Sequence, residues 1–184
     1  MSDLPAREFA ALRDAITRRG HLRSTLALGG LAVWAGLLVA TLVALPYPVA
    51  AVVPLTMLVA TFEVIRPLHA GAERIGRYLQ VFVEEAAAAT DAPLAPPAWE
   101  RTAMRFGPAV PGAAGHPLFV PLFTLATLVN LLAVALPRPV MVEGVLLTTT
   151  HAAFLAWLWR ADRAMRRQRS EELARYRALR DGAA

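Results

Sequence analysis

The fold is decided by residues 24–62, which read STLALGGLAVWAGLLVATLVALPYPVAAVVPLTMLVATF. These 39 residues lie between Arg23 and Glu63, and a tyrosine is their only ionisable side chain. A helix needs about 20 apolar residues to cross roughly 30 Å of hydrocarbon, so the stretch is long enough to cross a membrane twice. The sequence PYP at 46–48 interrupts it in the middle, because proline disfavours continuous helix. We therefore expect a transmembrane hairpin over residues 24–65.

A second apolar region, residues 117–159, repeats this arrangement. Residues 117–136 carry no charged side chain, PRP at 137–139 is the predicted turn, and residues 140–159 form the fourth predicted span. The two turns also match in sequence, ALPYPV against ALPRPV. The match suggests a duplicated hairpin, but chance similarity in so biased a composition is the interpretation that we favour.

The composition supports a membrane protein. Hydrophobic residues make up 57% of the 184 residues and charged residues 18%, with a mean hydropathy of +0.46. A water-soluble domain of this size could not bury so much apolar surface in one core. Cysteine is absent, which excludes disulfides, thiolate nucleophiles, iron–sulfur clusters and cysteine-based zinc sites. All 19 basic residues are arginine, and with the abundant Ala, Gly and Pro this is typical of a GC-rich bacterial genome.

The arginines predict the orientation of the spans. Residues 1–23 carry five arginines, residues 66–116 carry five and the tail from residue 160 carries eight, whereas the two turns together carry only Arg138. Basic residues accumulate on the cytoplasmic side of membrane proteins. We therefore expect an all-α four-helix bundle of two hairpins in a bacterial inner membrane, with both termini and the middle segment in the cytoplasm. The first span is too long, and its preceding segment too acidic, for a cleaved signal peptide.

Four cytoplasmic segments complete the predicted organisation. They are an N-terminal amphipathic helix (1–23), a helix with an apolar seam (66–86), a linker rich in Pro and Gly (87–116) and an arginine-rich helix (160–184). Within the linker, residues 97–107 suggest a short amphipathic helix with Trp99 and Phe106 on one face. It could lie on the lipid headgroups or dock on protein.

The helix that leaves the second span carries apolar residues at alternating spacings of three and four. They are Ile65, Leu68, Ala72, Ile75, Leu79 and Phe82. Such a seam packs against another helix, and we expect this helix to end near Glu85. Its partner could be the tail (Met165, Leu173, Tyr176, Leu179), the N-terminal helix (Phe9, Leu12, Ile16) or a second copy of the chain. Packing within one chain is the simpler interpretation.

The same helix carries the densest polar cluster in the sequence. Its members are Glu63, Arg66, His69, Glu73, Arg74 and Arg77. Arginines grouped at a membrane boundary are typical of an anion or lipid-headgroup site. The interpretation that we favour is a solvated helix face, since Glu73 and Arg77 form an i,i+4 pair of favourable order. His69 and Glu73 could share a metal ion, but two ligands make a weak site and we predict none.

Polar residues also fall inside the third and fourth predicted spans. Asn130, Glu143, Thr148 and His151 are costly to place in hydrocarbon, so they are candidates for a functional site. They could form a path for protons or ions. Alternatively, they could form hydrogen bonds between helices. A membrane haem would need a second facing imidazole, which no other span supplies, so we expect no cofactor.

The first span carries small residues four apart, at Ala32, Gly36, Ala40 and Ala44. Small residues at this spacing allow helices to approach closely, within the bundle by default or between two copies of the chain. Glycine-rich phosphate loops, Gly-x-Ser-x-Gly elbows, His-Glu-x-x-His motifs and paired active-site carboxylates are all absent from the sequence.

These observations favour a non-enzymatic function. We expect an accessory, scaffold or assembly subunit of a larger inner-membrane complex. Its expected partners are anionic lipid headgroups and other membrane subunits or copies of itself, and not nucleic acid. The alternative is an oligomeric transporter of ions, protons or small solutes that uses the polar residues of the third and fourth spans.

Overall fold

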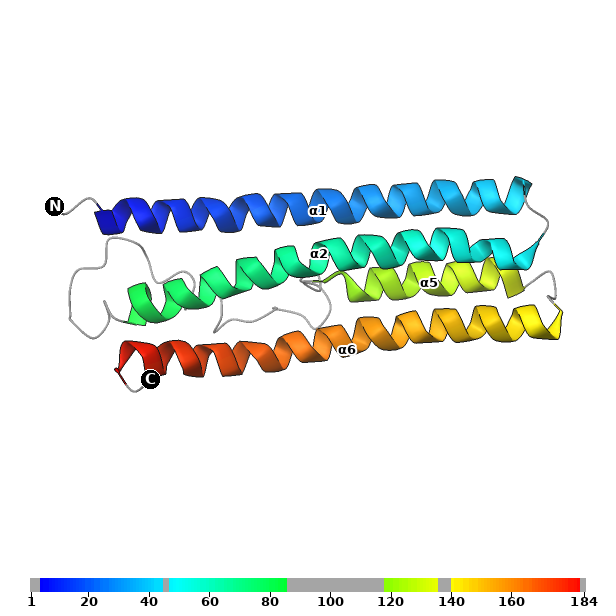
Figure 1. Cartoon of the computed structure of the whole chain (residues 1–184). Helices are drawn as coiled ribbons and strands as arrows, with labels where there is room; N and C mark the ends of the chain where they lie inside the picture. Colours follow the sequence, from blue (N-terminus) through cyan, green and yellow to red (C-terminus); the bar gives the residue numbers. More distant parts are fainter. Residues whose placement is uncertain (1–3, 45–46, 86–117, 136–139, 183–184) are drawn as a thin grey trace. The chain divides into compact units, whose positions relative to one another are not determined.

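The computed structural model describes residues 4–44, 47–85, 118–135 and 140–182. In these ranges the chain is all-α and has four α-helices (Figure 1). They are α1 (Leu4–Ala44), α2 (Val52–Leu79), α5 (Val120–Ala135) and α6 (Met141–Arg180). The 3₁₀ turn η1 (Pro48–Ala51) leads into α2, and the π-helical turn η2 (Gln80–Glu85) follows it. The predicted turns at 46 and 137–139 and the predicted linker helix at 97–107 lie outside the described residues.

Three of the four helices are long and apolar enough to cross a membrane. These are α1, α2 with its flanking turns, and α6. At 1.5 Å per residue, the 41 residues of α1 and the 40 of α6 each extend about 60 Å, roughly twice the thickness of the hydrocarbon core. The 16 residues of α5 extend only about 24 Å. The segment before the first predicted span therefore continues into it as one helix, as does the tail after the fourth.

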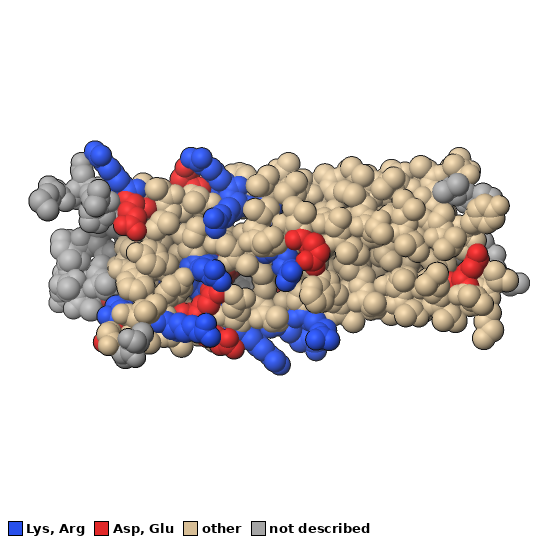
Figure 2. All heavy atoms as spheres, viewed as in Figure 1, with Lys and Arg blue, Asp and Glu red and all other residues tan. Residues whose placement is uncertain are grey.

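The described helices contribute to two compact units. We call Leu22–Pro67 with His116–Arg163 the apolar unit, and Met1–His21, Leu68–Gly115 and Ala164–Ala184 the charged unit. Figure 2 shows few charged atoms over the apolar unit and many over the charged unit. The surface of the apolar unit is itself hydrophobic: Leu28, Val39, Val43, Leu125, Leu132 and Val145 are each more than half exposed. Water would not tolerate so many exposed aliphatic side chains, whereas lipid would.

Three phenylalanines from three helices form the centre of the apolar unit. The ring of Phe62 on α2 meets Phe123 on α5 and Phe154 on α6 edge-to-face, with centroids 5.7 and 6.3 Å away. On an adjacent face of α2, Thr61 lies so close to Gly30 of α1 that a Cβ at residue 30 would overlap the threonine side chain. A glycine at this position therefore sets the separation of α1 and α2.

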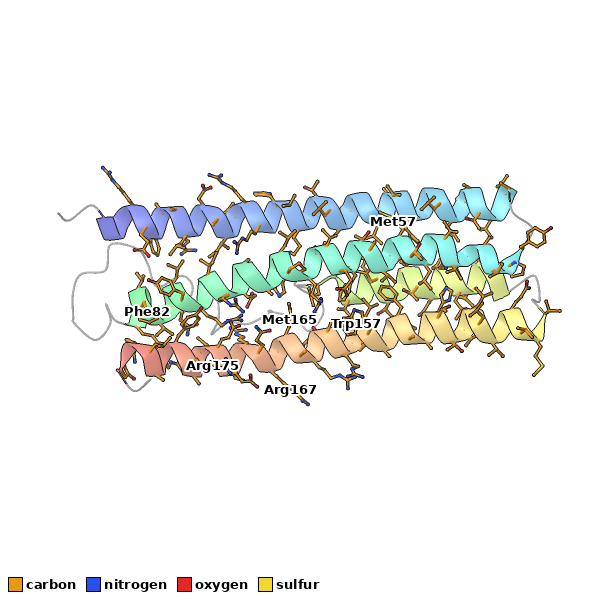
Figure 3. All side chains as sticks on the ribbon, in the orientation of Figure 1. Met57, Phe82, Trp157, Met165, Arg167 and Arg175 are labelled. Carbon is orange, nitrogen blue, oxygen red and sulfur yellow. The ribbon has the colours of Figure 1, made fainter. Side chains whose placement is uncertain are left out.

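In the charged unit, aromatic rings join α2 and η2 to α6. Tyr78 and Phe82 each lie 6.2 Å from Tyr176, centroid to centroid, and Leu79 beside them is fully buried. Figure 3 shows Phe82 in this arrangement, and Arg167 pointing away from it. The tail helix is therefore a partner of the predicted seam, as packing within one chain requires. The prediction is wrong for Leu179, which is 56% exposed.

Candidate functional site

The structure places Asn130 and His151 together in the core of the apolar unit. Both are fully buried, and each belongs to the inward stripe of its helix. On α5, Asn130 follows the buried Phe123 and Thr127 at helical spacing, and on α6, His151 follows the buried Leu147 by four residues. Buried polar groups in a membrane helix are costly unless they find hydrogen-bond partners. The contacts of these two side chains therefore decide what the site can do.

Asn130 binds three other segments of the apolar unit. Its Oδ1 accepts a hydrogen bond from Nε1 of Trp34 on α1 at 3.2 Å. Its Nδ2 donates to the Ala51 carbonyl in η1 at 3.0 Å and lies 2.9 Å from Nε2 of His151. One amide thus connects α1, η1, α5 and α6.

These partners fix the orientation of the Asn130 amide. Tryptophan has only an N–H donor, so it must face the amide oxygen, and the Ala51 carbonyl is only an acceptor, so it must face the amide nitrogen. The amide nitrogen therefore also faces His151, whose Nε2 must accept. The remaining proton is then on Nδ1, which donates to the Leu147 carbonyl at 2.7 Å. A neutral imidazole satisfies the whole network, whereas a second proton on Nε2 would meet the amide N–H of Asn130.

The Ala51 carbonyl lies at the junction of η1 and α2, because Ala51 ends the 3₁₀ turn and Val52 begins the α-helix. A carbonyl oxygen has two lone pairs, so it can accept from Asn130 as well as from a backbone N–H in the first turn of α2. The sequence does not reveal this acceptor, because a backbone carbonyl is common to all residue types. Trp34 was not predicted as a partner, because its side chain resembles the other apolar residues of the span.

The other two predicted intramembrane residues do not join the cluster. Thr148 is exposed on α6, and Glu143 is half-buried two turns before His151, with no hydrogen bond to Asn130 or His151. Thr150, next to His151, donates only to carbonyls of its own helix. Among the described residues, Asn130 and His151 therefore form a closed pair, and no continuous row of polar side chains leads from this pair along the helices.

The predicted cytoplasmic patch separates into two groups. Glu63 and Arg66 belong to the apolar unit, where they pair at 2.9 Å. Nε1 of Trp157 on α6 donates to Glu63 at 2.6 Å, and the Arg66 guanidinium lies over the Trp157 ring, 5.4 Å from its centroid. Figure 3 shows Trp157 extending from α6 towards α2. These three side chains connect α2 with α6 at the end of the apolar unit.

The second group lies in the charged unit and binds Glu172, which sequence analysis did not single out. Arg77, only 3% exposed, bonds to Glu172 at 2.6 Å and to Glu73 at 3.3 Å. Arg74 also reaches Glu172, at 3.3 Å. His69 is buried in the same unit. The predicted anion-binding arginines are therefore already occupied by carboxylates of the chain.

A second ion-pair group joins η2 to the end of α6. Glu85 accepts hydrogen bonds from Arg177 at 2.8 Å and from Arg180 at 3.0 Å. The hydrogen bonds and charges of Arg177 and Arg180 lower the pKa of the Glu85 carboxyl, although partial burial opposes them. No three His, Cys, Asp or Glu side chains of the described residues come together as a metal site would need.

The predicted small-residue stripe does not pack inside the bundle. Ala32, Gly36, Ala40 and Ala44 are all exposed, and Gly36 has open space around its Cα. The buried face of α1 carries Ala27, Gly30, Leu38 and Thr41 instead. Packing within the bundle was therefore the wrong expectation for this stripe, and contact between two copies stays a prediction. The chain matches no family model, and no curated protein or solved structure matches it.

Proposed function

We propose that this chain is a non-enzymatic accessory, scaffold or assembly subunit of a bacterial inner-membrane complex. It crosses the membrane four times as two hairpins, with both termini and the middle segment in the cytoplasm. Three long apolar helices and the exposed aliphatic surface of the apolar unit support its place in a membrane. The concentration of arginine outside the predicted turns supports the orientation.

The fourth crossing is assigned to α5. Its 16 described residues extend about 24 Å, some 6 Å less than an average hydrocarbon core. A short helix is accommodated by local thinning of the bilayer, at a fraction of a kcal/mol per Å. The surrounding residues 117–136 are uncharged, so they can complete the crossing.

The closed hydrogen-bond network of Asn130 and His151 is the observation that favours a structural function over proton transport. A proton relay needs a group that takes up a proton from one neighbour and gives it to another. Here both ring nitrogens of His151 are engaged, one with an amide donor and the other with a carbonyl of its own helix. Glu143 and Thr148 do not extend the pair towards either end of the helices. The site thus serves as a buried connection between helices.

Two measurements on the purified full chain test this function. In liposomes with a pH-sensitive dye inside, we expect no proton or ion flux above that of empty liposomes. In mild detergent, we expect a second membrane protein to remain bound in fixed stoichiometry through two purification steps.

Substitution of His151 separates the structural function from transport. If His151 is a packing residue, His151→Asn and His151→Gln should assemble with the partner as the original chain does. Flux in the original chain that disappears in His151→Asn, His151→Gln and His151→Leu, with all three variants folded, would instead establish the transport alternative.

A further inference from the structure

We propose that Arg160 and Arg163 of α6, together with Trp159, form a docking surface for the headgroups of anionic phospholipids. This inference rests on the proposed membrane crossing of α6 but not on the accessory function. All three residues lie at the end of the α6 segment of the apolar unit, and all three are exposed. The occupant is a lipid phosphate, for the reasons that follow.

These two arginines are not paired with carboxylates. Among the described residues, Arg160 makes no ion pair, and Arg163 donates only to the backbone carbonyl of Trp159, at 3.3 Å. Arg66 at the same end of the unit differs, because Glu63 already binds it. Guanidinium groups bind phosphate oxygens with two parallel hydrogen bonds, which Arg160 and Arg163 have free donors to make.

The distance along α6 places the pair at the membrane boundary. From Met141 to Arg160 the helix rises about 28 Å, close to the thickness of the hydrocarbon core. Just before the arginines, Trp157 and Trp159 are 42% and 45% exposed. Tryptophan gathers where hydrocarbon meets headgroups. The arginines that follow are therefore at the depth of the lipid phosphates.

The charge balance at this end of the apolar unit selects an anionic lipid over a zwitterionic one. Four arginines lie here, at 23, 66, 160 and 163, against two acidic residues, Glu63 and Asp162. Asp162 is only 5% exposed, whereas Arg160 and Arg163 are exposed. A basic cluster directly beside a span attracts anionic lipid by roughly a factor of five per arginine.

The test compares lipid binding by the delipidated full chain and its variants. Native mass spectrometry would measure the apparent Kd for phosphatidylglycerol and for phosphatidylcholine. We expect the original chain to prefer phosphatidylglycerol, and Arg160→Gln/Arg163→Gln to lose that preference by roughly 30-fold. The double variant should fold normally, as checked by circular dichroism, because both side chains are exposed.

Two further variants control for charge and for damage to the helix. Arg169→Gln/Arg175→Gln removes the same charge from exposed positions farther along α6 and should leave the preference unchanged. Arg160→Lys/Arg163→Lys keeps the charge but loses the two parallel hydrogen bonds, so its preference should lie between those of the original chain and of the glutamine variant. The proposal fails if the Arg169/Arg175 pair loses as much as the Arg160/Arg163 pair. Displacement of phosphatidylglycerol by equimolar inorganic phosphate would also overturn it, because the surface would then bind a soluble anion.

Discussion

Replacing Asn130 by leucine should destabilise the protein more than any other single change to the buried polar cluster. The substitution keeps a side chain of similar size but removes three hydrogen bonds at once, to Trp34, Ala51 and His151. Intramembrane hydrogen bonds contribute roughly 0.6 kcal/mol each on average, so we expect a loss of about 2 kcal/mol. His151→Leu removes only one contact between helices and should cost about 1 kcal/mol.

The free energy of unfolding can be measured for the full chain in mixed micelles, by titration with a denaturing detergent and detection by circular dichroism. Thr150→Val is the matched control on α6, because Thr150 bonds only to carbonyls of its own helix. It should change the free energy by less than about 0.5 kcal/mol. A double-mutant cycle of Asn130→Leu with His151→Leu should also show a coupling free energy, since the two side chains share one hydrogen bond. If His151→Leu proves more costly than Asn130→Leu, the central position of the amide in this network is refuted.

Four other outcomes can be checked. Reporter fusions at residue 92 and after the C-terminus should both read cytoplasmic and one in the turn at 137–139 periplasmic; a periplasmic C-terminus would contradict the four-span topology. Gly30→Val should destabilise the chain by about 1–3 kcal/mol in the same detergent titration, because Thr61 cannot change its rotamer without losing its hydrogen bond to the Met57 carbonyl. Gly36→Val, the control, should be nearly neutral. The free energy of unfolding should decrease as the pH is lowered and Glu85 becomes protonated, because a carboxyl with a lowered pKa stabilises the fold above its ordinary pKa and loses that contribution as the pH falls through the lowered pKa. Glu85→Gln should weaken this acid dependence. An unchanged profile would show that the ion pairs of Glu85 with Arg177 and Arg180 contribute nothing to stability. Ile75→Asp/Leu79→Asp should lower the melting temperature while membrane insertion persists, because Leu79 is fully buried in the charged unit, and an unchanged melting temperature would mean that the seam is not a packing surface.

The helical fold follows from features that a sequence displays directly. A run of 39 residues without a formal charge, broken by PYP, defines two apolar helices, and the structure places α1 and α2 there. The pairing of Asn130 with His151 could also be predicted from the sequence, because two buried polar groups in neighbouring apolar helices need partners and each can be a partner for the other. Their remaining partners depend on which way each helix faces, which residue type does not reveal.

The small-residue stripe shows this limit on α1. Ala32 and Trp34 are two positions apart, which is about 200° around a helix, so they occupy nearly opposite faces. A spacing of four identifies a stripe but not the side on which a neighbour lies. Gly30, which does meet α2, was not singled out because the fit depends on Thr61 across the contact. Likewise, the predicted arginine patch is divided because Glu172, almost one hundred residues away in sequence, binds part of it.

The connection of the first hairpin to Asn130 has a consequence for biogenesis. Trp34 and Ala51 both belong to the first hairpin, whereas the amide that binds them lies 79 residues after Ala51. At about 5–20 residues per second, a ribosome needs roughly 4 to 16 s to translate that interval. During this time Nε1 of Trp34 and the Ala51 carbonyl lack the amide that binds them in the folded chain, and only the synthesis of α5 supplies it. We therefore expect a nascent chain that stalls before Asn130 to lack the bond of Trp34 that the completed chain makes.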